Sequence, residues 1–254
     1  MIKEGEKILL FSEGKTFYTT AIQGKSLCTH LGTVSIDDVM EKDYGDFVLS
    51  SSGKCFWILN PLIADRTMKV KRKTAIIYPK DLSFLIFSSG ISSGSRVIEA
   101  GCGSGASAIA FAHYVKPSGK VYSYEIRDDF IALAEENIKA NNLSDYIVLK
   151  KRNVYSEGFD ETDVDFIFLD LPEPWHTVKF AHSSLKPSGV IMSISPTYNQ
   201  IEIMCKTLDE NGFIMIDTNE VIVRRILVRE GKTRPQERII SHTAFISSAR
   251  KVKK

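Results

Sequence analysis

The sequence has no apolar run long enough to cross a membrane. Its longest uncharged stretch, residues 100–115, has 16 residues and contains three glycines and a histidine, whereas a spanning helix needs roughly 18 apolar residues. The first seven residues are rich in charge, and no apolar run with a small-residue cleavage site follows them. No secretory signal is therefore expected. These absences exclude a transmembrane protein and predict a cytoplasmic one.

Cysteine is scarce, and histidine is scattered. No C-x-x-C pair occurs, so neither a zinc site nor a thioredoxin-like motif is indicated, and reduced thiols are expected. The histidines show no metal-like grouping, which favours structural roles and no bound metal. The residues concerned are Cys28, Cys55, Cys102 and Cys205, and His113, His176, His182 and His242. A net charge of +2 does not by itself announce a polyanionic partner.

What is present is enough apolar side chain for a sizeable core, since 43% of the 254 residues are hydrophobic and 25% are charged. Residues 1–70 show short strand-like runs separated by glycine turns, which predict a small all-β domain with a net charge of −1. Residues 71–254, with a net charge of +3, alternate strands with helices. This alternation predicts a parallel α/β sheet covered on both faces.

The end of the chain has a different pattern. Residues 213–216, 221–228 and 243–247 are strand-like, and no helix is indicated between the last two. We expect an antiparallel hairpin to close the sheet there. The predicted fold class is therefore α/β, a Rossmann-like sheet with a C-terminal antiparallel hairpin and a small N-terminal all-β domain.

A glycine-rich loop follows the strand predicted over residues 95–99 and opens a helix. In this context glycines let backbone N–H groups approach a nucleotide closely. The loop also fits the dinucleotide pattern G-x-G-x-x-G/A through Gly101, Gly103 and Ala106, so an NAD enzyme stays open at this point. The predicted cofactor-binding residues of this segment are Glu99, Gly101, Cys102, Gly103, Ser104, Gly105, Ala106 and Ser107.

Two further residues are candidates for the same ligand. Glu125 lies 20 residues beyond Gly105, at the end of the second strand, where a carboxylate can accept hydrogen bonds from both ribose hydroxyls. The alternative is that Glu125 is only a solvated residue at a strand end. Asn153 follows the third strand and could accept from an adenine amine, or it could be an ordinary loop cap. Glu99 suits an ammonium better than a diphosphate, which favours S-adenosylmethionine over a dinucleotide.

The fourth predicted strand, residues 164–169, ends in Asp170-Leu171-Pro172-Glu173-Pro174-Trp175. Ligands of open α/β sheets bind beyond such carboxyl ends. The two prolines remove backbone donors and stiffen the segment, while Asp170 can accept a hydrogen bond from a substrate N–H. Asp170 taken alone is also compatible with a helix cap. Trp175 is expected near cofactor or substrate without a catalytic role.

On these residues the chain resembles class I S-adenosylmethionine-dependent methyltransferases, and specifically the tRNA (adenine-58, N1) methyltransferase family called TrmI. The resemblance covers nearly the whole chain. Its motifs are residues 76–81 (IIYPKD), 99–105 (EAGCGSG), 170–175 (DLPEPW) and 242–245 (HTAF). Two departures are Ala75, where members often have Gln, and Asn153, where Asp is usual.

The resemblance implies S-adenosyl-L-methionine as cofactor, a homotetramer, tRNA as partner and catalysis involving Asp170 and Tyr78. The implied reaction methylates N1 of adenosine 58 in the T-loop; whether the neighbouring adenosine 57 is also methylated stays open. Because N1 lies on the Watson–Crick edge, the base must be extruded. Asp170 would then accept from N6, and Tyr78 would stack on the base or, alternatively, belong to the core.

Basic residues gather in the C-terminal segment. Residues 224–238 carry a net charge of +4 and, with residues 71–73 and 150–152, could form a stripe that neutralises phosphates. The alternatives are a solvated hairpin or a subunit contact. The basic residues of this segment are Arg224, Arg225, Arg229, Lys232, Arg234 and Arg238.

Three other functions remain alongside the main one. The first is a methyltransferase acting on a protein or small molecule, of isoaspartyl or precorrin type. The second is a non-catalytic RNA-binding subunit with a degenerate methyltransferase fold. The third is an NAD dehydrogenase.

Overall fold

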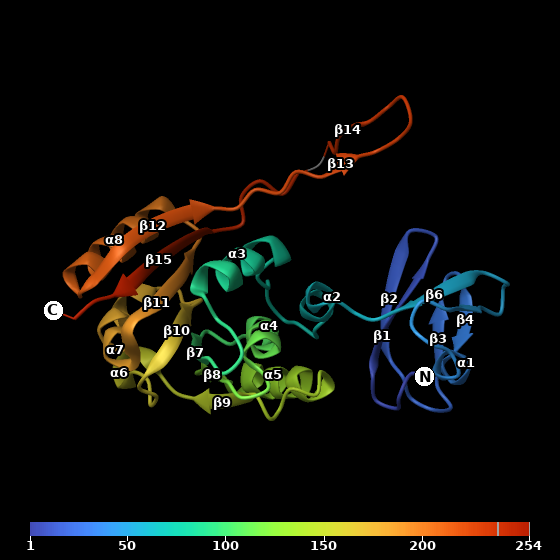
Figure 1. Cartoon of the computed structure of the whole chain (residues 1–254), viewed down its shortest axis with the longest axis horizontal. Coiled ribbons are helices and arrows are strands. Elements are labelled where there is room, and N and C mark those ends of the chain that lie inside the picture. The colour runs from blue at the N-terminus through green and yellow to red at the C-terminus, as the bar shows by residue number, and fades with distance from the viewer. Residues whose placement is uncertain (238, 254) are drawn as a thin grey trace. The chain divides into compact units, whose positions relative to one another are not determined.

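The computed structural model describes residues 1–237 and 239–253 (Figure 1). The chain divides into two compact units, Met1–Lys69 and Val70–Lys254, which are described in turn. In the described part of the chain, no helix has the length and apolar character that a membrane span needs.

The first unit is built from short antiparallel strands. Four of them form a sheet in the order β2-β1-β6-β5, and β3 pairs with β4 in a separate hairpin. Ile8, Leu10, Phe56 and Ile58 alternate inward along β1 and β6 and make the centre of its core. The elements are β1 (Lys7–Ser12), β2 (Lys15–Thr20), β3 (Ser26–Thr29), β4 (Gly32–Ser35), α1 (Ile36–Met40), β5 (Phe47–Leu49), β6 (Cys55–Leu59) and α2 (Ile63–Met68).

The second unit contains a seven-stranded sheet in the order β12-β15-β11-β10-β7-β8-β9. The five strands from β11 to β9 are parallel, while β15 pairs antiparallel with both β11 and β12. The strands are β7 (Arg96–Ala100), β8 (Lys120–Glu125), β9 (Ile147–Lys151), β10 (Val164–Leu169), β11 (Leu185–Ser195), β12 (Phe213–Glu220) and β15 (Phe245–Lys251). This arrangement confirms the predicted α/β class with an antiparallel closure.

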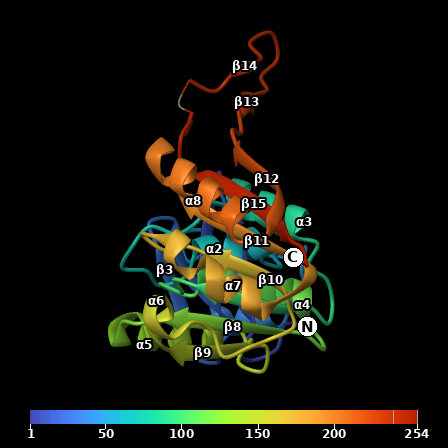
Figure 2. The ribbon, with the colours of Figure 1, turned by 90° about the vertical axis from the view of Figure 1, so that its left-hand side faces the viewer.

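Helices cover both faces of this sheet (Figure 2). Helices α3, α4 and α5 pack on one face, and α6, α7 and α8 lie on the other. The helices are α3 (Pro79–Ser89), α4 (Ala106–Val115), α5 (Asp128–Ala140), α6 (Val154–Glu157), the 3-10 helix η1 (Pro174–Thr177), α7 (Val178–Ser184) and α8 (Tyr198–Glu210).

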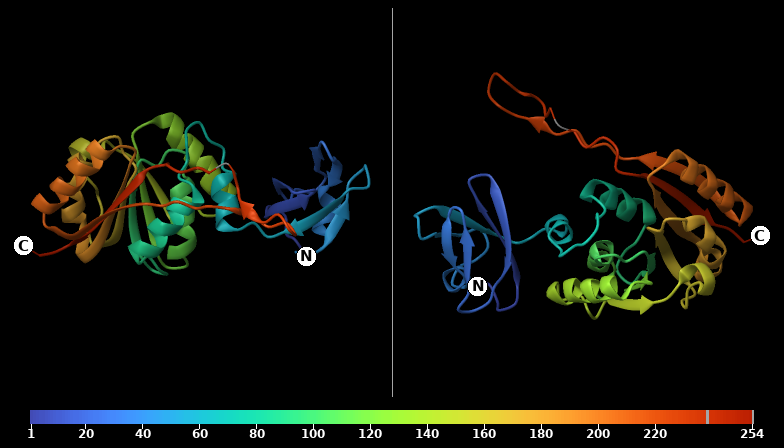
Figure 3. Two further views of the ribbon diagram at one scale, coloured as in Figure 1. Left: turned by 90° about the horizontal axis from the view of Figure 1, so that it is seen from above. Right: turned by 180° about the vertical axis from the view of Figure 1, so that it is seen from behind.

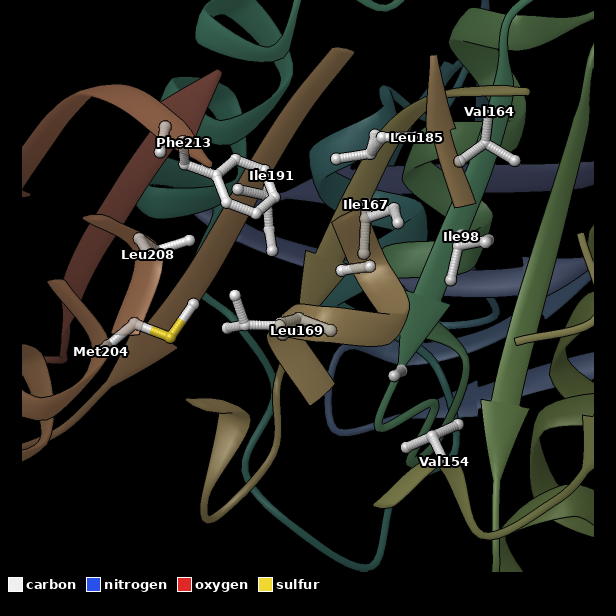
Figure 4. Close-up of a cluster of buried hydrophobic side chains, with 14 of the residues drawn as sticks. Ile98, Val154, Val164, Ile167, Leu169, Leu185, Ile191, Met204, Leu208 and Phe213 are labelled. Carbon is white, nitrogen blue, oxygen red and sulfur yellow. The ribbon is translucent and has the colours of Figure 1, made fainter. Parts of the chain in front are cut away.

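The central strand β10 is buried on both faces, as an apolar run in a parallel sheet requires. Phe166 and Phe168 meet the ring of Phe111 on α4 edge-on, with ring centroids 5.7 Å apart in each pair. The alternate residues Ile167 and Leu169 join the cluster under α7 and α8 (Figure 4). Packing on both sides fixes the end of β10, where Asp170 follows.

One prediction about the C-terminal strands is wrong. Residues 221–225 are not a strand, and only Ile226–Leu227 (β13) pairs, with Arg234–Pro235 (β14), in a separate two-stranded ribbon. The hairpin that closes the sheet joins β12 to β15 instead. Residues 221–243, hereafter the arm, leave the sheet between these two strands (Figure 3). The strand-like composition of residues 221–228 did not reveal that no strand of the main sheet pairs with them.

Candidate active site

The glycine loop is held between the ends of two neighbouring strands. The N–H groups of Gly101 and Cys102 both donate to the carbonyl of Tyr124, at 3.0 and 3.1 Å. Gly101 has φ +91°, and a Cβ at this position would lie 2.0 Å from the carbonyl oxygen of Asp170. Glycine is therefore required here because two backbones touch, which brings the loop and Asp170 together.

Glu125 is tied to this loop and is not merely a solvated strand end. Its carboxylate accepts from the N–H of Gly103 at 3.1 Å and from those of Ile126 and Arg127 at 2.9 and 3.1 Å. These bonds hold the carboxylate at the end of β8 but do not exhaust its lone pairs. It retains the capacity to accept from ribose hydroxyls.

A cavity of about 120 Å³ lies beside Glu125. It is smaller than the roughly 300 Å³ of a whole-ligand pocket, so it suits one part of a cofactor, such as its nucleoside end. Its lining comes from the loop, from the end of β8, from the residues that follow β9 and begin α6, and from the segment after Asp170. The lining residues are Gly101, Tyr124, Glu125, Ile126, Arg152, Asn153, Val154, Tyr155 and Leu171.

Two further acids carry raised pKa values. Burial raises the pKa of Glu99, whose carboxylate accepts a hydrogen bond from the Ser123 hydroxyl, to about 8. The negative charge of Asp170 contributes to that rise. The surrounding chain removes water from the Asp170 carboxyl group and so raises its pKa to about 6, although the residue as a whole is exposed at the surface. An acidic site of this kind favours a cationic ligand and opposes a diphosphate.

The remaining predicted loop residues are buried or nearly so at the start of α4. Ser104, Ala106 and Ser107 lie below 9% exposure, and the backbone of Gly105, with φ +79°, begins the helix. Burial also raises the pKa of the Cys102 thiol, which keeps it protonated. These residues shape the loop.

Asn153 has the structural role that the sequence left as an alternative. Its side-chain oxygen accepts from the N–H of Tyr155 at 3.1 Å and so caps α6. Asn153 also lines the cavity. An amide oxygen has two lone pairs, so the cap is compatible with a second donor such as an adenine amine.

Asn137, which the sequence reasoning missed, anchors the loop from below. Its amide donates to the carbonyls of Ser104 and Lys71, at 2.9 and 2.8 Å, and accepts from the Lys71 N–H at 3.0 Å. It is 4% exposed. The sequence did carry a signal for this role, because Asn137 is a polar residue on the apolar face of its helix, next to Phe130, Ala134 and Ile138.

The segment after β10 is held at three points. Asp170 donates its N–H to the carbonyl of Ala100 at 2.9 Å. The carbonyl of Pro172 accepts from the Gln200 amide at 3.1 Å, and the N–H of Glu173 donates to the Tyr155 hydroxyl at 3.1 Å. Tyr155 and Gln200 are further residues that the sequence alone did not single out.

Tyr78 has a different setting from the acids. It immediately precedes α3, is 39% exposed, and accepts through its carbonyl from the N–H groups of Asp81 and Leu82. The partial exposure excludes full burial in the core. Among the described residues, the hydrogen bonds of Tyr78 go to Asp81 and Leu82 in the first turn of α3. No hydrogen bond among them connects Tyr78 to Asp170.

The residues after Tyr78 tie α3 to the base of the arm. The Lys80 ammonium donates to Asp81, to the carbonyl of Val221 and to the Thr243 hydroxyl, at 2.6 to 2.7 Å. Thr243 in turn donates to Asp81 at 2.8 Å. The Asp81 side chain is 1% exposed, so this pair is buried and fully hydrogen-bonded. Two motifs of the sequence, YPKD and HTAF, thus meet in one network.

The predicted basic stripe is only partly available. Lys71, Lys73, Lys150 and Arg152 pair with acidic neighbours, so their charges are largely offset. In the arm, no ion pair within the described residues involves Arg224, Arg225, Arg229 or Lys232, whereas Arg234 pairs with Glu237. Arg238 lies outside the described residues. The arm also exposes Ile222, Val223, Ile226, Val228, Ile239 and Ile240.

No group of histidines, cysteines and carboxylates within residues 1–237 and 239–253 has the arrangement of a metal site. The acids around the glycine loop instead fit a cationic cofactor with a nucleoside end. The loop after the first parallel strand, the carboxylate at the end of the second and the antiparallel last strand define a class I S-adenosylmethionine-dependent methyltransferase.

Comparison with known proteins is more specific. A model of the tRNA methyltransferase complex GCD14 subunit family matches residues 54–252, and the chain belongs to this family. The chain is 34% identical to tRNA (adenine(57)-N(1)/adenine(58)-N(1))-methyltransferase TrmI of Methanocaldococcus jannaschii, over 96% of this chain and 94% of that protein. The resemblance found in the sequence is confirmed.

Two solved structures share the fold over the full chain. A crystal structure described as a SAM-dependent O-methyltransferase from Thermotoga maritima has a TM-score of 0.92 at 38% identity, covering 100% of this chain and 95% of that one. The tRNA (m1A58) methyltransferase TrmI from Aquifex aeolicus has a TM-score of 0.85 at 27% identity, covering 100% and 99%.

Proposed function

We propose that this chain transfers a methyl group from S-adenosylmethionine to N1 of adenosine 58 in the T-loop of tRNA. The observation that carries the proposal is the position of Asp170. Its backbone touches Gly101 of the glycine loop, and the next residue, Leu171, lines the cofactor cavity. A carboxylate there lies beside both the cofactor and the space in which a base would enter.

Glu125 is assigned to the ribose hydroxyls, and the Asn153 region to the adenine end of the cofactor. Asp170, and Glu99 when it is ionised, supply negative charge near the cationic end. Bound S-adenosylmethionine supplies an electrophilic methyl group that needs no further activation. Positioning is therefore the main task of the protein.

Asp170 is assigned the orientation of the target base. Its carboxylate accepts from the exocyclic N6 amine, which places N1 toward the methyl donor. The same charge stabilises the positive charge that grows on the ring during transfer. Tyr78, partly exposed at the start of α3, is assigned the stacking contact with the extruded base, worth about 1–3 kcal/mol.

The arm is assigned to assembly and tRNA contact. Its exposed apolar side chains support a contact between copies in a homotetramer, and its arginines support a contact with phosphates. Sedimentation of the intact chain and of an Ile226→Asp, Val228→Asp variant tests the first part. A wild-type chain that sediments as a monomer removes the tetramer.

The reaction is tested by incubating unmodified tRNA transcript with labelled S-adenosylmethionine and mapping the modified nucleoside. We expect 1-methyladenosine at position 58, and none there in a transcript with guanosine at that position. Digestion also reports position 57. A small-molecule alcohol serves as the second substrate, because one structural relative is described as an O-methyltransferase. Transfer to the alcohol and not to tRNA overturns the proposal.

A further inference from the structure

Tyr155 touches both halves of the site. It is the second residue of α6, two positions after Asn153, and it lines the cavity assigned to the nucleoside end of the cofactor. Its hydroxyl oxygen accepts the N–H of Glu173 at 3.1 Å, in the segment that follows Asp170. One side chain therefore joins the cofactor cavity to residues 170–174, hereafter the proline loop.

The proline loop has few backbone groups with which to hold itself. Pro172 and Pro174 lack an N–H, so Leu171 and Glu173 supply the backbone donors between Asp170 and η1. The Glu173 N–H is used by Tyr155, and the Pro172 carbonyl by Gln200 of α8. Side chains from two other elements thus determine the path of the loop.

Tyr155 is itself held in place from two directions. Its N–H donates to the Asn153 side chain that caps α6, and its ring meets that of His176 edge-on at 6.1 Å. Its position consequently depends on the residues that line the cofactor cavity. Displacement of the ring would carry the hydroxyl away from Glu173.

We propose that Tyr155 is a positioning residue that holds the proline loop, and through it the Asp170 carboxylate, in the orientation that methyl transfer requires. The hydroxyl does this from the wall of the cofactor cavity, so a filled cavity steadies the loop. The inference rests on the proposed function in that Asp170 is the group being oriented.

The test compares the wild-type chain with Tyr155→Phe, which keeps the ring and removes the acceptor. We expect kcat for tRNA methylation to fall about 5- to 10-fold, the effect of one lost hydrogen bond. Affinity for S-adenosylmethionine, measured by calorimetry, stays within about 2-fold, since the ring remains. Tyr146→Phe, a hydroxyl loss in the turn immediately before β9, is the matched control and keeps the wild-type rate.

Two measurements separate positioning from a general loss of stability. In an Asp170→Asn background the added Tyr155→Phe change should have little further effect, because it acts through the missing carboxylate. Hydrogen exchange of the peptide covering residues 170–177, with saturating S-adenosylmethionine, should be slowed by the cofactor in the wild type but not in Tyr155→Phe. The exchange readout does not depend on turnover.

The outcomes distinguish this inference from the proposed function. A wild-type chain that leaves tRNA unmodified defeats the function, and the exchange experiment then still decides whether Tyr155 holds the loop. An active wild type with an impaired Asp170→Asn variant, but an unimpaired Tyr155→Phe variant, overturns the inference alone. Equal exchange in both chains, or fully additive losses in the double variant, also overturns it.

Discussion

The cofactor end of the sheet and the arm belong to the same unit but are built in opposite ways. At the cofactor end, Gly101, Glu125 and Asp170 are tied to one another's segments by backbone contacts. The arm has one short strand pair and exposes both apolar and basic side chains. The difference is that the segments of the cofactor end contact one another, whereas the arm leaves its apolar and basic side chains exposed.

The largest expected effect comes from removing the Asp170 carboxylate at the cofactor end. Asp170→Ala should lower kcat by about 10²–10³-fold, as for loss of a group that stabilises developing charge. Affinity for S-adenosylmethionine should stay near the wild-type value, measured by calorimetry. Full activity in this variant would remove Asp170 from the mechanism.

The same carboxylate predicts an acid limb in the rate profile. Since its pKa is raised to about 6, the ionised form and the activity are expected to decline as pH falls below about 6. The measurement is kcat/KM against pH, with intact folding checked by circular dichroism. In Asp170→Asn the residual activity should lack this limb; a limb that persists would point to another group.

Gly101→Ala tests whether the cofactor end depends on close backbone approach. The new Cβ would meet the Asp170 carbonyl at 2.0 Å, so the strand ends must separate. We expect a loss of about 1–3 kcal/mol in unfolding free energy, together with weaker cofactor binding. Gly90→Ala is the control, because Gly90 also has positive φ but has no atom near its Cβ position. Similar losses of unfolding free energy in both variants would show that strain at a positive φ, and not the close approach to Asp170, causes the effect.

Substitution in the arm should leave the cofactor end untouched. Arg224→Ala with Arg225→Ala is expected to raise KM for tRNA and to lower the log–log salt slope of tRNA binding by about one per lost phosphate contact. Affinity for S-adenosylmethionine should not change. Lys71→Ala is the control, since that ammonium is already paired with Glu136. An unchanged salt slope would assign the arm to subunit contact alone.

The smallest effect concerns stability and pH at the buried end. Burial raises the pKa of Glu99 to about 8 in the folded chain, above its unfolded value. As far as Glu99 is concerned, the folded chain is most stable below about pH 4.5, where this group is protonated in both the folded and the unfolded chain. That stability is lost as pH rises through about 8. Glu99→Gln lacks this loss, so its stability relative to the wild type should rise between about pH 4.5 and pH 8 and then level off.

Denaturant unfolding at several pH values measures that difference. Exposed Glu135→Gln is the control and should follow the wild type at every pH. Above about pH 8, where the wild-type carboxyl is ionised, Glu99→Gln should also bind S-adenosylmethionine more weakly, because one negative charge beside the cation is gone. A stability difference that is flat across pH 5 to 9 would show that folding does not raise the pKa of Glu99.

The arm marks where sequence interpretation failed. Residues 221–228 are rich in β-branched side chains, which predicted a strand. Strand pairing depends on a neighbouring strand, and among the described residues this run has ladder partners at Ile226 and Leu227, in β14 and not in the main sheet. The ion pairs of the basic stripe were not foreseen either, because the carboxylates that pair with it come from positions that no local pattern identifies.

What the sequence determined by itself is the local part of this protein. Alternating strands and helices, the glycine loop and the DLPEPW segment are encoded in neighbouring residues, since periodicity and backbone preferences act over a few positions. Only the tertiary structure decided that Gly101 touches Asp170, that Asn137 holds the loop and that Tyr155 reaches Glu173. These contacts join positions 18 to 69 residues apart, and only the packed sheet brings such positions together.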